Sequence, residues 1–185
     1  MIFGVAIFGM AILGMAESTF TAVHVLISLV GIASGLLVIY GLLSSKRFDG
    51  ATAIFLATTV LTSVTGFLFP FEHVLPSHIV GVTSLLVLAV AILARYVKDM
   101  NGLWRSVYVV SAVIALYLNV FVLVAQIFLK VPAVHELAPT GKEPPFLIVQ
   151  LIVMALFVVL GILAVKKFRL QPVAAEPAWK NTKAS

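Results

Sequence analysis

The stretch LWRSVYVVSAVIALYLNVFVLVAQIFL, residues 103–129, is an almost continuous apolar run with one charged residue, Arg105. A helix needs about 20 mostly apolar residues to cross a hydrocarbon core about 30 Å thick. This stretch exceeds that length and contains no proline. The sequence therefore predicts a transmembrane helix at this position.

Four further apolar runs lead to the same prediction, at about residues 20–43, 51–69, 78–97 and 146–165. The 185-residue chain is 62% hydrophobic and 10% charged, whereas about a quarter of the residues in soluble domains are charged. We therefore predict an all-α fold: a polytopic membrane helical bundle of four to five principal transmembrane helices, surrounded by the lipid bilayer.

The predicted bundle occupies residues 20–169 and is flanked by two shorter segments. Residues 1–19 form a short apolar N-terminal segment, whose first 16 residues would reach about 24 Å as a helix. We expect a short additional helix or an interfacial segment there. Residues 170–185 are polar and contain two prolines, which predicts a flexible tail.

The basic residues predict the orientation of the bundle, because cytoplasmic loops retain Lys and Arg. With five alternating spans, one side of the membrane receives Lys46, Arg47, Arg95, Lys98, Arg105, Lys166, Lys167, Arg169, Lys180 and Lys183, and the other side receives only Lys130 and Lys142. The first side, which includes the C-terminus, is predicted to be cytoplasmic. Arg95 and Tyr96 are expected to snorkel to the interface on that side.

Composition also excludes several classes of chemistry. The absence of cysteine removes disulfides, thiolate nucleophiles, iron–sulfur ligation and covalent haem attachment. The basic residues lie at the ends of apolar runs rather than in a patch with aromatic residues, so nucleic acid is not an expected partner. No phosphate-binding glycine loop or GxSxG motif is present, and the sequence does not favour an enzyme.

Polar residues gather on the predicted outward side of the bundle. The stretch FPFEHVLPSH, residues 69–78, joins the second and third spans and contains Glu72, His73 and His78. His24 on the first span is expected at a depth similar to that of His78. Gln126 and Gln150, on the last two spans, are expected near the same level and facing inward, since carboxamides in hydrocarbon are costly unless paired.

This outward zone predicts two kinds of ligand site. The first is a b-type haem held between His24 and His78, with Gln126 and Gln150 contributing to the pocket and small residues admitting the macrocycle; the candidates are Gly31, Gly35, Gly66 and Gly81. The second is a transition metal bound by His24, His78 and Glu72, or by Glu136 in place of Glu72, because nitrogen and oxygen ligands suit copper or zinc. Either site would make the protein a redox or accessory protein.

A structural interpretation competes with these sites. Histidines at helix ends are often hydrogen-bonded without binding a ligand, and none here has HxxxH or HExxH spacing. Gly31 and Gly35 form a GxxxG pair, which is typical of close helix packing, and the Ser and Thr residues of the second span usually bond the backbone or a neighbouring helix. The alternative is a structural or assembly subunit of a membrane complex. A small-molecule transporter is less favoured, because no inverted repeat is visible.

Three stretches carry a resemblance to known proteins: residues 24–43, residues 55–96, and residues 115–140 with the motif EPPF at 143–146. Together they resemble a group of small bacterial inner-membrane proteins without an assigned function. The resemblance covers roughly residues 20–167. It implies a bacterial cytoplasmic membrane, and it carries over no catalytic residue.

Overall fold

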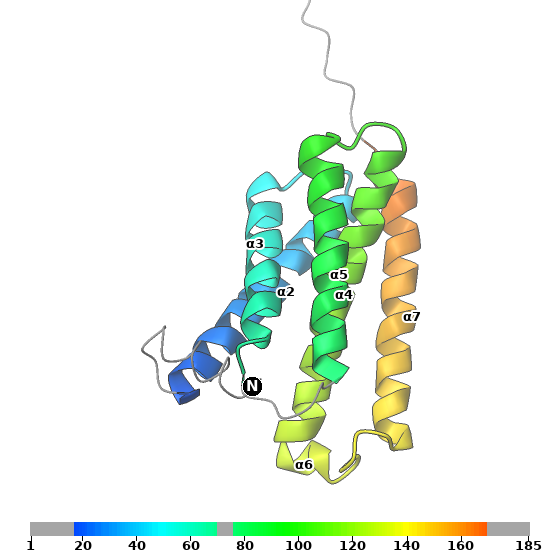
Figure 1. Ribbon diagram of the computed structural model, residues 1–185. Helices are drawn as coiled ribbons and strands as arrows, with labels where there is room; N and C mark the ends of the chain where they lie inside the picture. The colour runs from blue at the N-terminus through cyan, green and yellow to red at the C-terminus, as the bar shows by residue number, and fades with distance from the viewer. Residues whose placement is uncertain (1–16, 70–75, 170–185) are drawn as a thin grey trace, which may run out of the picture.

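The computed structural model describes residues 17–69 and 76–169, and every regular element in these two ranges is helical (Figure 1). The helices are α2 (Glu17–Leu43), α3 (Asp49–Gly66), α4 (Pro76–Ile92), the π-helix η1 (Leu93–Val97), α5 (Leu103–Lys130), α6 (Pro132–His135) and α7 (Pro144–Lys167). The predicted all-α fold is confirmed. The predictions made for Glu72, His73, residues 1–16 and residues 170–185 lie outside the described residues.

Four of these helices are long and apolar enough to cross a membrane: Ser18–Leu43, His78–Val97, Leu103–Lys130 and Pro144–Lys167. This finding confirms a multi-pass membrane bundle. The fifth predicted span corresponds to α3, which has 18 residues and a length of about 27 Å. α3 is the least apolar of the long helices because five threonines and a serine interrupt it.

α5 is the central helix of the bundle. It contacts α2, α4 and α7, and it buries a stripe that includes Tyr108, Ala112, Ala115 and Leu116. Figure 1 shows α3, α4, α5 and α7 running side by side, while α2 crosses the bundle obliquely. The short helix α6 follows α5 at the end of the bundle opposite to the start of α3.

Close contact between α2 and the bundle depends on Gly35. A Cβ atom at this position would lie 2.6 Å from Leu116 Cδ1 and 2.9 Å from Phe55 Cδ2, so only glycine fits without displacing its neighbours. One turn earlier, a Cβ at Gly31 would lie 3.1 Å from Thr58 Oγ1. The GxxxG pair therefore brings the α2 backbone against α3 and α5, as close packing of membrane helices requires.

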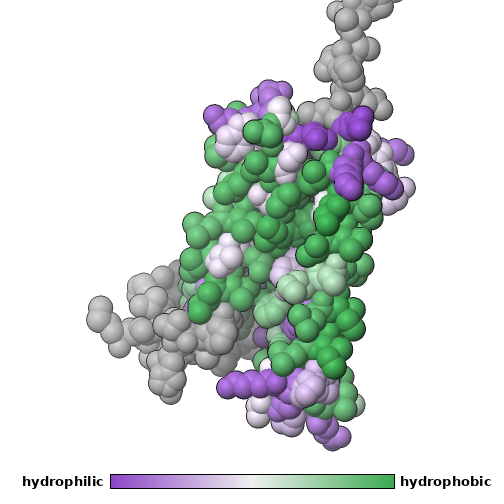
Figure 2. Space-filling view, turned by 90° about the vertical axis from the view of Figure 1, so that its right-hand side faces the viewer, coloured by the Kyte–Doolittle hydropathy of each residue, from purple (hydrophilic) through white to green (hydrophobic). Residues whose placement is uncertain are grey.

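The surface has the hydropathy pattern of a membrane protein. In Figure 2, which shows the face at the right of Figure 1, an apolar band separates hydrophilic groups at the two ends of the bundle. The end with the C-terminus of α7 contains Lys46, Arg47, Lys98, Arg105, Lys166, Lys167 and Arg169. The band fits the lipid tails, and the charged ends fit the headgroup layers.

We predict that Gly35→Ala lowers the free energy of unfolding by about 2 kcal/mol, because the added methyl group overpacks the contact with Phe55 and Leu116. The measurement is unfolding by sodium dodecyl sulfate in mixed micelles, followed by circular dichroism. Gly50→Ala is the matched control, because a Cβ at Gly50 meets nothing within 4 Å. Equal stability of the two variants would contradict the packing role of Gly35.

Candidate functional site

His24 bonds to a threonine of the neighbouring helix. Its Nδ1 lies 2.8 Å from Thr65 Oγ1, and its ring meets the ring of Phe69 edge-on at 5.0 Å between centroids. The Thr65 hydroxyl donates its proton to the Leu61 carbonyl at 2.6 Å. His24 Nδ1 is then the donor to Thr65, because a hydroxyl has a single proton to give. This tautomer leaves Nε2 of His24 as the basic nitrogen.

His78 lies in the first turn of α4 and packs on a different phenyl ring. Its ring centroid is 5.7 Å from that of Phe67. A Cβ at Gly81, one turn further along α4, would lie 3.0 Å from Phe67 Cζ. The segment that ends α3 thus supplies one ring to His78 and another, Phe69, to His24. Both histidines lie at the predicted end of the bundle.

The glycines that were expected to admit a macrocycle admit protein side chains. Phe55 and Leu116 fill the space at Gly35, Phe67 fills that at Gly81, and Thr58 and Thr59 approach Gly31. A haem between His24 and His78 therefore requires these side chains to move. The haem site stays a prediction of the sequence.

The two glutamines lie in different environments. Gln150 is buried, and its Nε2 donates to the Phe121 carbonyl at 3.0 Å, which joins α7 to α5. Its Oε1 has no hydrogen-bond partner among the described residues. Gln126 is exposed, so the prediction that it faces the interior of the bundle is wrong.

The described residues contain no group of three His, Cys, Asp or Glu side chains that could hold a metal ion. The proposed ligand Glu72 lies outside these residues, so a site of His24, His78 and Glu72 stays a prediction. His135 is engaged elsewhere, since its Nδ1 lies 3.1 Å from the Phe128 carbonyl. Beside it, Glu136 forms the C-cap of α6.

Polar side chains within the apolar band join pairs of helices. Ser28 Oγ on α2 donates to the His24 carbonyl at 2.8 Å and lies 3.3 Å from Thr62 Oγ1 on α3, and Ser63 on α3 donates to Ser84 on α4 at 3.2 Å. Asn119 on α5 donates from Nδ2 to Thr59 on α3 at 3.0 Å. Such bonds satisfy groups that would otherwise face hydrocarbon.

The strongest charged cluster lies at the opposite end of the bundle and corrects an expectation. Arg95 does not snorkel to the interface; it is 5% exposed, and its Nη2 pairs with the Asp49 carboxylate. Its guanidinium carbon lies 5.1 Å from the centroid of the Tyr108 ring. Arg95 Nε has no hydrogen-bond partner in the described part of the chain. The cluster joins the start of α3 to η1 and α5.

The π-helix explains why Arg95 points inward. In η1 the Lys98 amide bonds the Leu93 carbonyl five residues earlier, so the helix is wider than an α-helix and its side chains are rotated. Asp49 and Gly50 are the first two residues of α3. The sequence signal for the ion pair was that Asp49 and Arg95 are predicted to lie at the same depth in the membrane.

Around Arg95, two further contacts complete the cluster. Arg95 Nη1 lies 3.8 Å from Met100 Sδ, and the Tyr108 hydroxyl lies 3.5 Å from Thr52 Oγ1. Tyr108 is 1% exposed. The ion pair and the cation–π contact hold three helices together, and nothing in the cluster resembles a nucleophile with an adjacent base.

An apolar layer separates the two polar zones. Phe55, Leu56 and Leu116 are at most 3% exposed. They lie between the Asn119–Thr59 bond and the Tyr108–Thr52 contact, as their positions along α3 and α5 require. These three side chains separate the two polar contacts along α3 and α5.

Comparisons with protein families, with curated protein sequences and with solved structures find no match to this chain. The resemblance to small inner-membrane proteins over residues 20–167 therefore stays a prediction. The geometry of the two polar zones is the basis for a functional proposal.

We predict that Asp49→Asn lowers the free energy of unfolding by about 3 kcal/mol, because it leaves the buried guanidinium of Arg95 without a counter-charge. Arg95→Met should cost less, about 1 kcal/mol, since the Asp49 side chain is 70% exposed and water can solvate its carboxylate. Denaturation in mixed micelles measures both changes. The opposite ranking of the two variants would show that the pair does not depend on burial of Arg95.

Proposed function

We propose that the chain is a non-catalytic structural or assembly subunit of a membrane complex in a bacterial cytoplasmic membrane. The observation that carries this proposal is that polar side chains within the apolar band are engaged with neighbouring helices of the same chain. His24 bonds to Thr65, Ser28 bonds to Thr62, and Asn119 bonds to Thr59.

These hydrogen bonds stabilise the packing of the helices against one another. Hydrogen bonds between membrane helices contribute about 0.6 kcal/mol each on average, and they add to the close packing at small residues. Three of them lie along α3, which has the most extensive contact with α2. Their sum fixes how α2, α3 and α5 pack, which is what a rigid subunit needs.

Other membrane-protein subunits are the partners that this proposal requires. α7 buries Gln150, Phe157 and Ala164, which are spaced seven residues apart along one stripe. The remainder of the helix is largely exposed and apolar, on the face shown in Figure 2. Such a surface suits both lipid and a second apolar helix.

Haem or metal binding is the second candidate, and one observation favours it. Because His24 donates from Nδ1 to Thr65, its Nε2 is the nitrogen that can act as a ligand. A protein hydrogen bond of this kind orients many ligating histidines. The packing of Phe67 against Gly81 weighs against a macrocycle at this position.

The orientation that we propose places the basic end of the bundle in the cytoplasm. In the described residues, eight basic side chains lie at the end where α7 terminates, and two, Lys130 and Lys142, lie at the other end. Retention of Lys and Arg in the cytoplasm supports this orientation, with the C-terminus inside and the histidines outside.

The first test separates the two candidates. We expect protein purified in mild detergent to show no Soret absorption and no stoichiometric metal. His24→Ala and Thr65→Val should each lower the free energy of unfolding by about 1 kcal/mol, and less than additively when combined, because they remove the same bond.

The contrary outcome is equally specific. A Soret band or bound metal that is lost in His24→Ala or His78→Ala, and kept in Thr65→Val, would overturn the structural proposal in favour of a cofactor. A protein that leaves the membrane in native lipid particles as a lone monomer would also contradict the role of a subunit.

The second test uses the absence of cysteine in the chain. We expect a single cysteine at the exposed position Lys142 to react with a membrane-impermeant maleimide in intact cells. A cysteine at Lys166, also exposed, should react only after permeabilisation. Labelling in the reverse order would invert the proposed orientation.

A further inference from the structure

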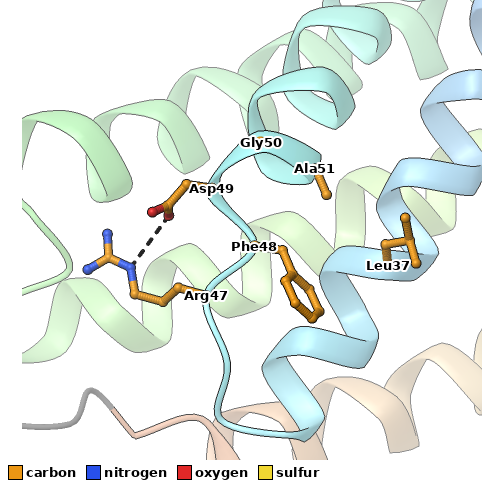
Figure 3. A pocket seen from close by; sticks show the side chains of 6 residues that line it. All are labelled: Leu37, Arg47, Phe48, Asp49, Gly50 and Ala51. Carbon is orange, nitrogen blue, oxygen red and sulfur yellow. Dashed lines mark ion pairs between the residues drawn. The ribbon is translucent and has the colours of Figure 1, made fainter.

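An open hollow of about 440 Å³ lies beside the loop that joins α2 to α3 (Figure 3). It is lined by Leu37, Arg47, Phe48, Asp49, Gly50 and Ala51. Figure 3 shows the side chains of Phe48 and Leu37 on the α2 side of the loop, and those of Arg47 and Asp49 on the other side of the loop backbone. The hollow therefore has an apolar wall and a charged wall.

The apolar wall continues onto the lipid-facing surface. Leu37 is 56% exposed, and Phe48 stacks on the exposed ring of Tyr40, with 6.2 Å between ring centroids and 11° between ring planes. A Cβ at Gly41 would lie 2.8 Å from Phe48 Cδ2, so glycine there lets the Phe48 ring lie against α2. The hollow thus opens where the apolar band meets the charged end of the bundle.

The charged wall contains the exposed guanidinium of Arg47, which forms an ion pair with Asp49. Asp49 is paired by the buried Arg95, which neutralises its carboxylate. Arg47 Nε lies 3.6 Å from Asp49 Oδ1, which is too long for a hydrogen bond. The Arg47 side chain is 51% exposed. Its exposed N–H groups are therefore accessible to an anion, while Asp49 is shared with Arg95.

We propose that this hollow binds an anionic phospholipid, with Arg47 pairing the phosphodiester and Leu37 and Phe48 contacting the glycerol and the first methylenes. Arginine forms paired hydrogen bonds with phosphate oxygens. The end of the bundle around the hollow has eight basic residues and, in the described chain, two acidic ones, Asp49 and Asp99. This charge selects anionic lipids over zwitterionic ones. The site does not depend on the proposed scaffold function or on the orientation.

The test is native mass spectrometry of the purified full chain with added phosphatidylglycerol, and with phosphatidylcholine as the zwitterionic comparison. Arg47→Gln is expected to weaken phosphatidylglycerol binding about fivefold, the effect of one cation near a lipid surface. Lys166→Gln removes the same charge from the same end at a residue that does not line the hollow, and it should leave this binding unchanged.

A steric variant keeps the test independent of charge. A Cβ at Gly50 meets nothing within 4 Å, so there is space for a side chain to begin there; Gly50→Leu adds one at the wall of the hollow and should reduce phosphatidylglycerol binding with Arg47 intact. Equal losses in Lys166→Gln and Arg47→Gln would show diffuse attraction only. Unchanged binding in Gly50→Leu, or equal binding of phosphatidylcholine, would also overturn the proposal.

Discussion

The close approach of α2 to α3 and α5 at Gly31 and Gly35 is the contact on which the rest of the bundle depends. Lipid tails are as apolar as leucine, so burial from water does not drive membrane helices together. Packing and hydrogen bonds must do so, and both need backbones that come close. Because Gly35 has no side chain, Phe55 and Leu116 reach the α2 backbone. That approach also brings His24 and Ser28 within bonding distance of α3.

Segment length and polarity were sufficient to predict the five long helices, because crossing a bilayer imposes a minimum apolar length. They did not predict which way each side chain points. α4, the helix that precedes Arg95, is apolar on nearly all sides. Its sequence therefore has no periodicity from which the inward direction of the Arg95 side chain could be predicted. Gln126 lies near the end of a helix, where the requirement to face inward is weaker, and it is exposed.

The candidate site was predicted in part. His24 and His78 lie at the same end of the bundle because each is near the start of its helix, and α2 and α4 enter the bundle from the same end. Their partners do not follow. Thr65 meets His24 because of the oblique crossing of α2, and Phe67 meets His78 because the chain continues past the end of α3. These contacts depend on crossing angles that a single sequence does not encode locally.

The position of Arg95 depends on how many residues the wide turn at Leu93–Val97 contains, and not only on which residues they are. Each residue of an α-helix advances the chain by about 100° around the axis. A π-turn holds one residue more than an α-helical turn, so deleting one residue here would restore regular winding and shift the residues inside the turn relative to α3 and α5. Arg95 would then leave its present position, and the acid at the start of α3 would lose its cation. A change of length here would therefore be more damaging than most changes of side chain.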